Sequence, residues 1–220
     1  MSVVCNNQDL TRKVYCVNLK ARNLRSEQKD ATREQILEAA TRLLAEHGYA
    51  ALRVAAVATE AGVSLGGQLH HFPSKESLVI AVLERLSARV LDLAVQEAAR
   101  ASDEDDCLAP ISKSAERFYA APEFLIYLDI FLSVRRHTLV GDTAARLLLS
   151  QRAATEALWL PHLTGRGISE EEALLIVRSL WALSRGLAIS SAGEQRKSND
   201  QATIDFAIKA LRHTYLKNHE

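Results

Sequence analysis

Apolar residues recur at helical spacing along most of this chain. Between residues 32 and 47 one helix face carries Ile36, Leu37, Ala40, Leu43 and Leu44. Five later segments keep the same period: 109–120, 122–138, 141–160, 173–190 and 201–216. The four prolines fall at segment edges, where a missing N–H does least harm, and few strand patterns remain between them. The sequence therefore predicts an all-α fold.

Start and stop signals mark several of these helices. Thr32 with Gln35, Ser169 with Glu172, and Ser198 with Gln201 each have the spacing of a capping box at a helix N-terminus. Gly48 suits the left-handed position that follows the end of a helix. A longer helix opens at Ser74 and carries apolar residues from Leu78 to Leu93.

Two short helical segments, 54–61 and 64–71, are joined by Gly62 and Val63. Ser64 is placed to cap the second segment. This spacing lets the second helix of a pair lie in a DNA major groove while the first crosses the backbone. From spacing alone a purely structural helix pair is equally open, because such pairs also occur in proteins with no DNA role.

The order of residues in this region resembles the N-terminal DNA-binding domain of TetR-like (tetracycline-repressor type) transcriptional regulators. The runs that carry the resemblance are QILEAA at 35–40, LAEHGY at 44–49, VATEAGVS at 57–64 and HHFPSKE at 70–76. The match covers about residues 32–86, and the rest of the chain is similar to that family only in its helical architecture. The resemblance implies a homodimer that reads a palindromic double-stranded DNA operator and is released by a small-molecule effector.

By position, the resemblance assigns DNA contacts to eight residues. Ser64 would touch phosphate, and Leu65, Gly67 and Gln68 would point at base edges, where the Gln68 amide could pair with adenine. The alternative for Gln68 is an ordinary surface glutamine. His71 and Lys75 match phosphate-contacting positions. The two remaining residues are His70, either a groove-facing donor or a solvated side chain, and Arg53.

The sequence departs from the family pattern at three of its DNA-binding positions. Leu65 stands where a basic or polar residue is common, and Leu69 where a tyrosine often touches phosphate. Arg53 replaces the Thr or Ser that commonly caps the second helix, and it could itself reach a phosphate. The departures at Leu65 and Leu69 leave an alternative open: a helical protein-interaction module that retains a helix-turn-helix shell with little DNA specificity.

The charge balance excludes a protein that binds nucleic acid through bulk positive charge. The chain has 27 basic and 27 acidic residues, and non-specific affinity for DNA comes from cationic side chains. Residues 31–80 hold four basic and five acidic side chains, a net charge of −1. Residues 1–30 hold six basic and three acidic ones, a net charge of +3. We expect a flexible arm at 1–30 that contacts phosphates or the minor groove, or else a disordered start.

We expect three parts along the chain: the arm at 1–30, the helix-turn-helix domain at 31–77, and a helical ligand-binding and dimerisation domain at 78–220. The segments 173–190 and 201–216 have broader apolar faces than one helix of a small domain needs. An intrachain core would explain these faces, but the resemblance favours a four-helix interface between two copies.

A polar residue interrupts the most apolar segment, because Asp129 lies within FLIYLDIFL at 124–132. A carboxylate there is costly unless it is paired, and Arg136, Arg178 and Arg185 are candidate partners. It is either a structural buried pair or a group facing a ligand in an aromatic pocket. The expected pocket residues are Tyr119, Phe124, Tyr127, Asp129, Phe131, Trp159, Trp181 and Arg185.

Other classes of protein find little support. The three cysteines have no tight spacing, the adjacent His70 and His71 point about 100° apart, and no metal or other cofactor is implied. There is no glycine-rich phosphate loop and no nucleophile motif, so we expect no enzyme. No apolar run approaches the roughly 20 residues that span a bilayer, and we expect a cytoplasmic protein with no membrane partner.

Overall fold

The fold is all-α throughout the part of the chain that the structure describes. The computed structural model describes residues 7–101, 106–134, 137–190 and 197–216, and for 7–26 and 197–199 it describes the backbone alone. The helices in these ranges are α1 (Asn7–Ala51), α2 (Val54–Glu60), α3 (Leu65–His71), α4 (Lys75–Ala101), α5 (Leu108–Ala120), α6 (Pro122–Ser133), α7 (Leu139–Thr164), α8 (Glu170–Ser190) and α9 (Lys197–Tyr215).

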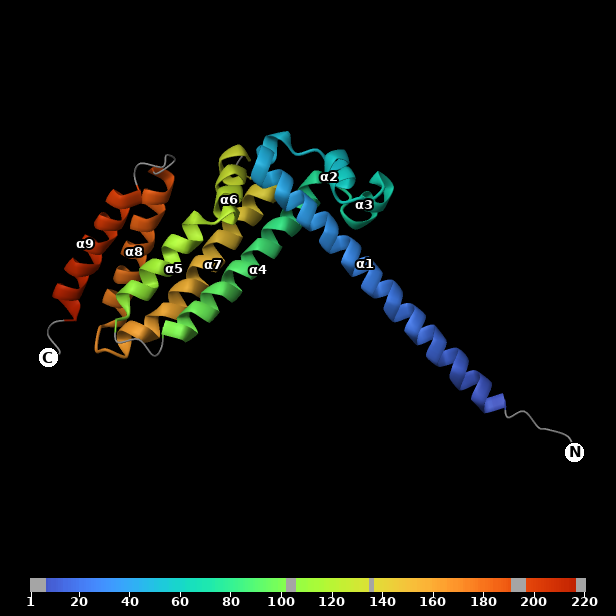
Figure 1. Cartoon of the computed structure of the whole chain (residues 1–220), viewed down its shortest axis with the longest axis horizontal. Helices are drawn as coiled ribbons and strands as arrows, with labels where there is room; N and C mark the ends of the chain where they lie inside the picture. The colour runs from blue at the N-terminus through green and yellow to red at the C-terminus, as the bar shows by residue number, and fades with distance from the viewer. Residues whose placement is uncertain (1–6, 102–105, 135–136, 191–196, 217–220) are drawn as a thin grey trace, which may run out of the picture.

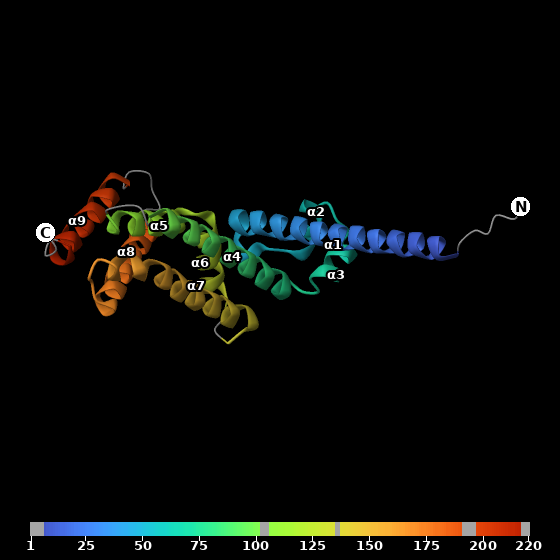
Figure 2. The ribbon, with the colours of Figure 1, turned by 90° about the horizontal axis from the view of Figure 1, so that it is seen from below.

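The short helices α2 and α3 lie beside the C-terminal half of α1, whose N-terminal half projects beyond them at one end of the molecule, and α9 lies at the other end (Figures 1 and 2). Between them, α4 packs against α7, and α5 packs against α8. Helix α6 packs against α1 and also against α5 and α7, so it links the N-terminal helix to the bundle. This arrangement separates a small N-terminal unit from a larger bundle, with α4 and α6 in contact with both.

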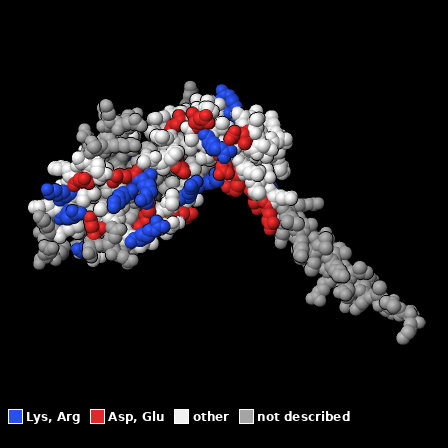
Figure 3. Space-filling model, viewed as in Figure 1, with Lys and Arg blue, Asp and Glu red and all other residues white. Residues whose placement is uncertain are grey.

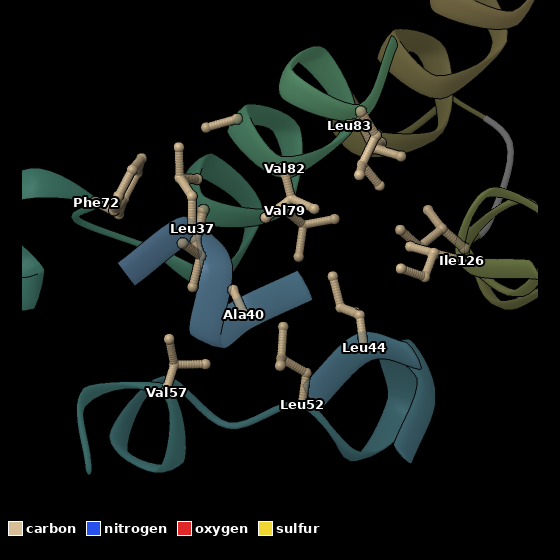
Figure 4. Close-up of a cluster of buried hydrophobic side chains, with 14 of the residues drawn as sticks. Leu37, Ala40, Leu44, Leu52, Val57, Phe72, Val79, Val82, Leu83 and Ile126 are labelled. Atoms are coloured by element: carbon tan, nitrogen blue, oxygen red, sulfur yellow. The ribbon is translucent and has the colours of Figure 1, made fainter. Parts of the chain in front are cut away.

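One core cluster holds the N-terminal unit on the bundle. In Figure 4 its side chains converge from α1, α2, α4 and α6, and they include Leu37, Val57, Val79 and Ile126. Phe72, which follows α3, is 4% exposed and belongs to the same cluster. Because the apolar side chains of these helices are buried in one shared cluster, the orientation of α2 and α3 depends on packing against helices of the bundle.

Helix α1 begins much earlier than the sequence pattern indicated. It starts at Asn7, so it includes most of the segment expected to be a flexible arm. Thr32 is therefore an interior residue, and its hydroxyl donates to the Gln28 carbonyl at 2.8 Å instead of capping a helix. Inside a helix a Thr hydroxyl can bond the carbonyl four residues back. Because α1 begins well before Thr32, no helix N-terminus is present there for the hydroxyl to cap. Gly48, with φ of 75°, interrupts the helix where a stop was predicted.

The other helix signals are confirmed in part. Ser169 and Glu172 form the predicted capping box, with Glu172 Oε2 2.6 Å from Ser169 Oγ. Ser74 and Ser77 bond each other reciprocally at the start of α4. Helix α9 begins at Lys197, before the predicted box at Ser198, whose side chain lies outside the described part. Pro161, expected at a helix edge, lies inside the last turn of α7.

Candidate functional site

The turn between α2 and α3 has the geometry of a helix-turn-helix. Gly62 has φ of +68° and no atom within 4 Å of where a Cβ would stand, so backbone conformation alone favours glycine there. The Ser64 hydroxyl accepts the Gly67 N–H at 3.1 Å and caps α3 as predicted. These two residues fix where α3 begins and how it leaves the turn.

The outer face of α3 is apolar and uncharged. Leu65 is 46% exposed and Leu69 is 41% exposed, and their i, i+4 spacing puts them on one face, with His70 exposed beside Leu69. The helix contains no Lys, Arg, Asp or Glu. Figure 3 shows few charged side chains over this end of the molecule. Any base reading by α3 therefore depends on shape, apolar contact and neutral donors.

Gln68 does not lie on that face, which corrects the expectation that its amide pairs with a base. It has no exposed surface, and neither amide atom has a hydrogen-bond partner in the described structure. The physical reason is helix phase: residue 68 falls about 100° from Leu69 and turns toward the domain interior. A buried, unpaired amide costs about 1–3 kcal/mol, so its position works against stability.

Lys75 and Arg53 both bind the chain at 49–52. The Lys75 ammonium donates to the Tyr49 carbonyl at 2.6 Å and lies 4.3 Å above the Tyr49 ring. Burial, and then the charge of Arg53, lower the pKa of Lys75. The Arg53 guanidinium donates to the Ala50 carbonyl at 2.8 Å and leaves α2 without a side-chain cap. Both cations thus stabilise this loop, and their phosphate contacts stay a prediction.

The adjacent histidines are placed differently from each other. His70 is exposed, whereas His71 is half-buried and its pKa is lowered, first by burial and then by the nearby His70. Their ring centroids are 5.8 Å apart with the rings nearly perpendicular. The lowered pKa favours the neutral form of His71, and no cluster of metal-binding side chains is found among the described residues.

Asp129 joins the small unit to the bundle and does not line the pocket, contrary to the ligand-facing reading. Its Oδ2 accepts the Tyr49 N–H at 2.6 Å, and its Oδ1 accepts from Ser133 Oγ at 3.3 Å. A Cβ at Gly48 would stand 3.1 Å from Oδ2. A backbone N–H, not an arginine, satisfies this carboxylate, because the chain breaks helix at Gly48 and leaves the Tyr49 N–H free to donate. Arg136, one of its expected partners, lies outside the described residues.

A cavity of about 470 Å³ lies within the bundle, between α4, α5, α6, α7 and α8. Six of the eight expected pocket residues line it: Tyr119, Phe124, Tyr127, Phe131, Trp181 and Arg185. Trp159 does not line it, because its ring is fully buried in a second core cluster beside His162. Burial raises the pKa of Tyr127 to about 12, so its hydroxyl stays protonated and donates to the Leu83 carbonyl.

The polar part of the cavity comes mainly from residues that the sequence did not single out. Glu156 accepts from Arg178 Nε and Nη2 at 2.8 and 3.0 Å, and from Arg152 Nε at 2.8 Å. The hydrogen bonds from Arg178 lower the pKa of Glu156 despite its burial. Gln151 and Thr155 also line the cavity. The i, i+4 spacing of Arg152 and Glu156 was a readable signal, but it looks the same on any exposed helix.

The terminal helices expose large apolar side chains. Phe206 on α9 is 75% exposed, and Leu175 and Ile189 on α8 are about half exposed. Helix α8 also has the length and apolar composition of a membrane-spanning helix, but it packs against α5, α7 and α9 within the bundle. Its apolar surface is therefore partly core and partly uncovered.

A small helical unit that presents an exposed second helix from a glycine turn, set on a helical bundle, defines a helix-turn-helix DNA-binding protein. Residues 36–82 match the family model described as bacterial regulatory proteins, tetR family. The chain is 30% identical over 196 residues to the HTH-type transcriptional regulator CymR of Pseudomonas putida, covering 89% of this chain and 97% of CymR. The chain belongs to the tetR family of DNA-binding transcription regulators.

Two further comparisons agree with this assignment. The HTH-type transcriptional regulator RutR of Escherichia coli (strain K12) is 30% identical over 172 residues, which is 77% of this chain and 71% of RutR. A crystal structure of a tetR-family regulator from Mesorhizobium loti superposes with a TM-score of 0.69 at 20% identity, covering 85% of this chain and 98% of that one. The similarity thus extends through the bundle and beyond the helix-turn-helix unit.

Proposed function

We propose that this chain is a homodimeric repressor that binds a palindromic operator and is released when a small molecule enters the cavity. The observation that carries the proposal is the junction at Tyr49 and Asp129. It links the unit that bears α3 to α6, and α6 also lines the cavity through Phe124, Tyr127 and Phe131. A ligand that moves α6 would therefore move the DNA-binding unit.

For DNA recognition, we propose that Leu65 and Leu69 contact thymine methyl groups and that His70 supplies a hydrogen-bond donor to a base edge. Their common exposed face supports this assignment, and the T methyl is the apolar feature of the major groove. Ser64 and Gly67 would bring the start of α3 close to the DNA backbone. Gln68 is left out because it is buried.

Arg53 and Lys75, which support the loop at 49–53, would lie near phosphates together with His71, and the basic segment 1–30 would add phosphate contacts. The net charge of +3 in that segment supports this role. Deleting residues 1–25 and measuring the salt dependence of DNA affinity tests it. An unchanged slope would remove the arm from the proposal.

For assembly, we propose that residues 173–190 and 201–216 pair with the same helices of a second copy. The exposed Phe206, Leu175 and Ile189 support an apolar interface there. Two-fold pairing would place two copies of α3 for successive major grooves, about 34–36 Å apart for half-sites one turn apart. Such a regulator acts on DNA in the cytoplasm and needs no catalytic group.

Selection from a random oligonucleotide pool with the full chain tests the proposed function. We expect an enriched inverted repeat with thymines in each half-site. Replacing those thymines by deoxyuridine removes only the methyl groups, and affinity should fall about tenfold or more. Enrichment of no sequence would favour the alternative, an interaction module that retains a helix-turn-helix shell.

A further inference from the structure

The cavity has an excess of positive charge. Its charged lining residues are Arg152, Glu156, Arg178 and Arg185, three cations against one carboxylate. Glu156 is bound by both Arg152 and Arg178, so the carboxylate is already shared between two guanidinium groups. The third cation has no acidic partner within the cavity. A neutral or cationic ligand would leave this excess uncompensated.

Arg185 is that third cation. Among the described residues it forms no ion pair, and it lines the cavity together with Tyr119, whose pKa is raised by burial and lowered in part by the charge of Arg185. Arg185 is exposed on α8, while Tyr119 is buried, so the guanidinium stands where the cavity meets solvent. A guanidinium fork binds carboxylate or sulfonate oxygens through two parallel hydrogen bonds.

Four aromatic side chains form one connected part of the lining, beside aliphatic residues and the polar Gln151 and Thr155. Phe118, Tyr119, Phe124 and Trp181 form mutual ring contacts with centroids 4.8 to 5.8 Å apart, and several of these contacts are edge-on or tilted. The exposed faces and edges of such a ring cluster favour contact with another flat, apolar group in the cavity. The cavity volume of about 470 Å³ is in the range of sites for small organic molecules.

We infer that the cavity binds an organic anion with a flat aromatic body, whose acid group pairs with Arg185 while its rings lie among Phe118, Tyr119, Phe124 and Trp181. The inference rests on the proposal that this cavity receives the effector. It adds the chemical class of that effector and names Arg185 as the residue that selects for negative charge.

Two fluorescent probes with the same ring system test the inference. The full chain is titrated with 1-anilinonaphthalene-8-sulfonate and with N-phenyl-1-naphthylamine, which lacks the sulfonate. We expect the sulfonate to bind about tenfold tighter. Arg185→Gln should abolish that difference without weakening the neutral probe, and Arg185→Lys, which keeps the charge, should restore part of it. Arg100→Gln, in the exposed last turn of α4, is the matched control.

Ala182→Trp would place a large side chain in the cavity, so this variant reports whether the probes bind inside the cavity. Loss of both signals in this variant places both probes in the cavity. If the two probes then bind equally, or Arg185→Gln changes neither, the cavity still takes ligands and the inference about charge is wrong. If Ala182→Trp leaves both titrations unchanged, the cavity takes neither probe, and the effector role in the proposed function fails with the inference.

Discussion

The backbone N–H of Tyr49 donates to the carboxylate of Asp129 across 80 positions of sequence, at 2.6 Å. On the other side of the same residue, the Tyr49 carbonyl accepts from Lys75. Tyr49 is thus bound by the bundle through one backbone atom and by the start of α4 through another. The loop that precedes α2 is fixed by these two contacts.

Asp129→Asn should weaken this link. The neutral amide is a poorer acceptor than a carboxylate, and we expect the free energy of unfolding to fall by about 1–2 kcal/mol. Chemical denaturation monitored by circular dichroism measures the change. Asp92→Asn, an exposed site on α4, is the control and should change stability little. Equal stability of the two variants would contradict a structural role for Asp129.

Gln68→Met should stabilise the protein without loss of DNA binding. The substitution keeps the length of a fully buried side chain and removes an amide that has no partner. We expect a gain of about 1–2 kcal/mol in the free energy of unfolding. Denaturation and binding to the selected operator are measured on the same preparation. Normal stability with lost operator binding would instead restore Gln68 as a base contact.

Leu65→Ala and Leu69→Ala should each weaken operator binding about tenfold and leave the folded state intact, because both side chains are largely exposed. The decisive measurement repeats each titration on the operator with thymine replaced by deoxyuridine. If a leucine contacts a thymine methyl, the loss of binding free energy on removing both groups will be smaller than the sum of the two single losses. Fully additive losses would show that the two groups do not meet.

Glu156→Gln should reduce stability at neutral pH and flatten its decline in acid. Since Arg178 lowers the pKa of Glu156 below its ordinary value of 4.5, the folded protein holds the ionised carboxylate more firmly than the unfolded chain. That stabilisation is present above about pH 4.5 and is lost as the pH falls through the lowered pKa. Urea midpoints measured between about pH 3 and pH 7 give the profile. An identical profile for the variant would refute the ion-pair contribution.

Phe206→Asp should convert a dimer to a monomer. Phe206 is 75% exposed, so its replacement costs the isolated fold little, whereas two buried charges would oppose pairing across a two-fold axis. We expect the dissociation constant of the dimer to rise at least about tenfold in analytical ultracentrifugation. Leu132→Asp, at a side chain 73% exposed on α6, should leave the dimer unchanged. Loss of dimer in both variants would point to general destabilisation.

Helix type and order were readable from the sequence because they depend on local period, glycine and capping residues. Ser64, Gly62 and the pair Ser169 and Glu172 are local signals of this kind, and each has the expected conformation or bond. The start of α1 was not readable, since a polar helix extension carries no apolar period. In addition, a Thr hydroxyl can either cap a helix or bond the carbonyl four residues back, and Thr32 does the second.

Site residues were harder to predict, because one helical residue differs from its neighbour by about 100° in direction. Leu69 and Gln68 are adjacent, yet the first is exposed and the second is buried. Likewise Phe131 lines the cavity, while Asp129, two residues earlier, faces Tyr49. Family position indicated the right segment for Gln68 and Leu69, and the apolar pattern did so for Asp129 and Phe131. Tertiary packing decided which side of the helix each residue occupies.

The close approach at Gly48 has a consequence for building chimaeric regulators. Grafting the first 75 or so residues of this chain onto another member's bundle would bring Gly48 and Tyr49 without Asp129. The Tyr49 N–H would then lack its acceptor in the new bundle. A side chain larger than Asp at position 129 would clash with the backbone at Gly48. A functional exchange of operator specificity between relatives should therefore transfer residue 129 together with the DNA-binding unit.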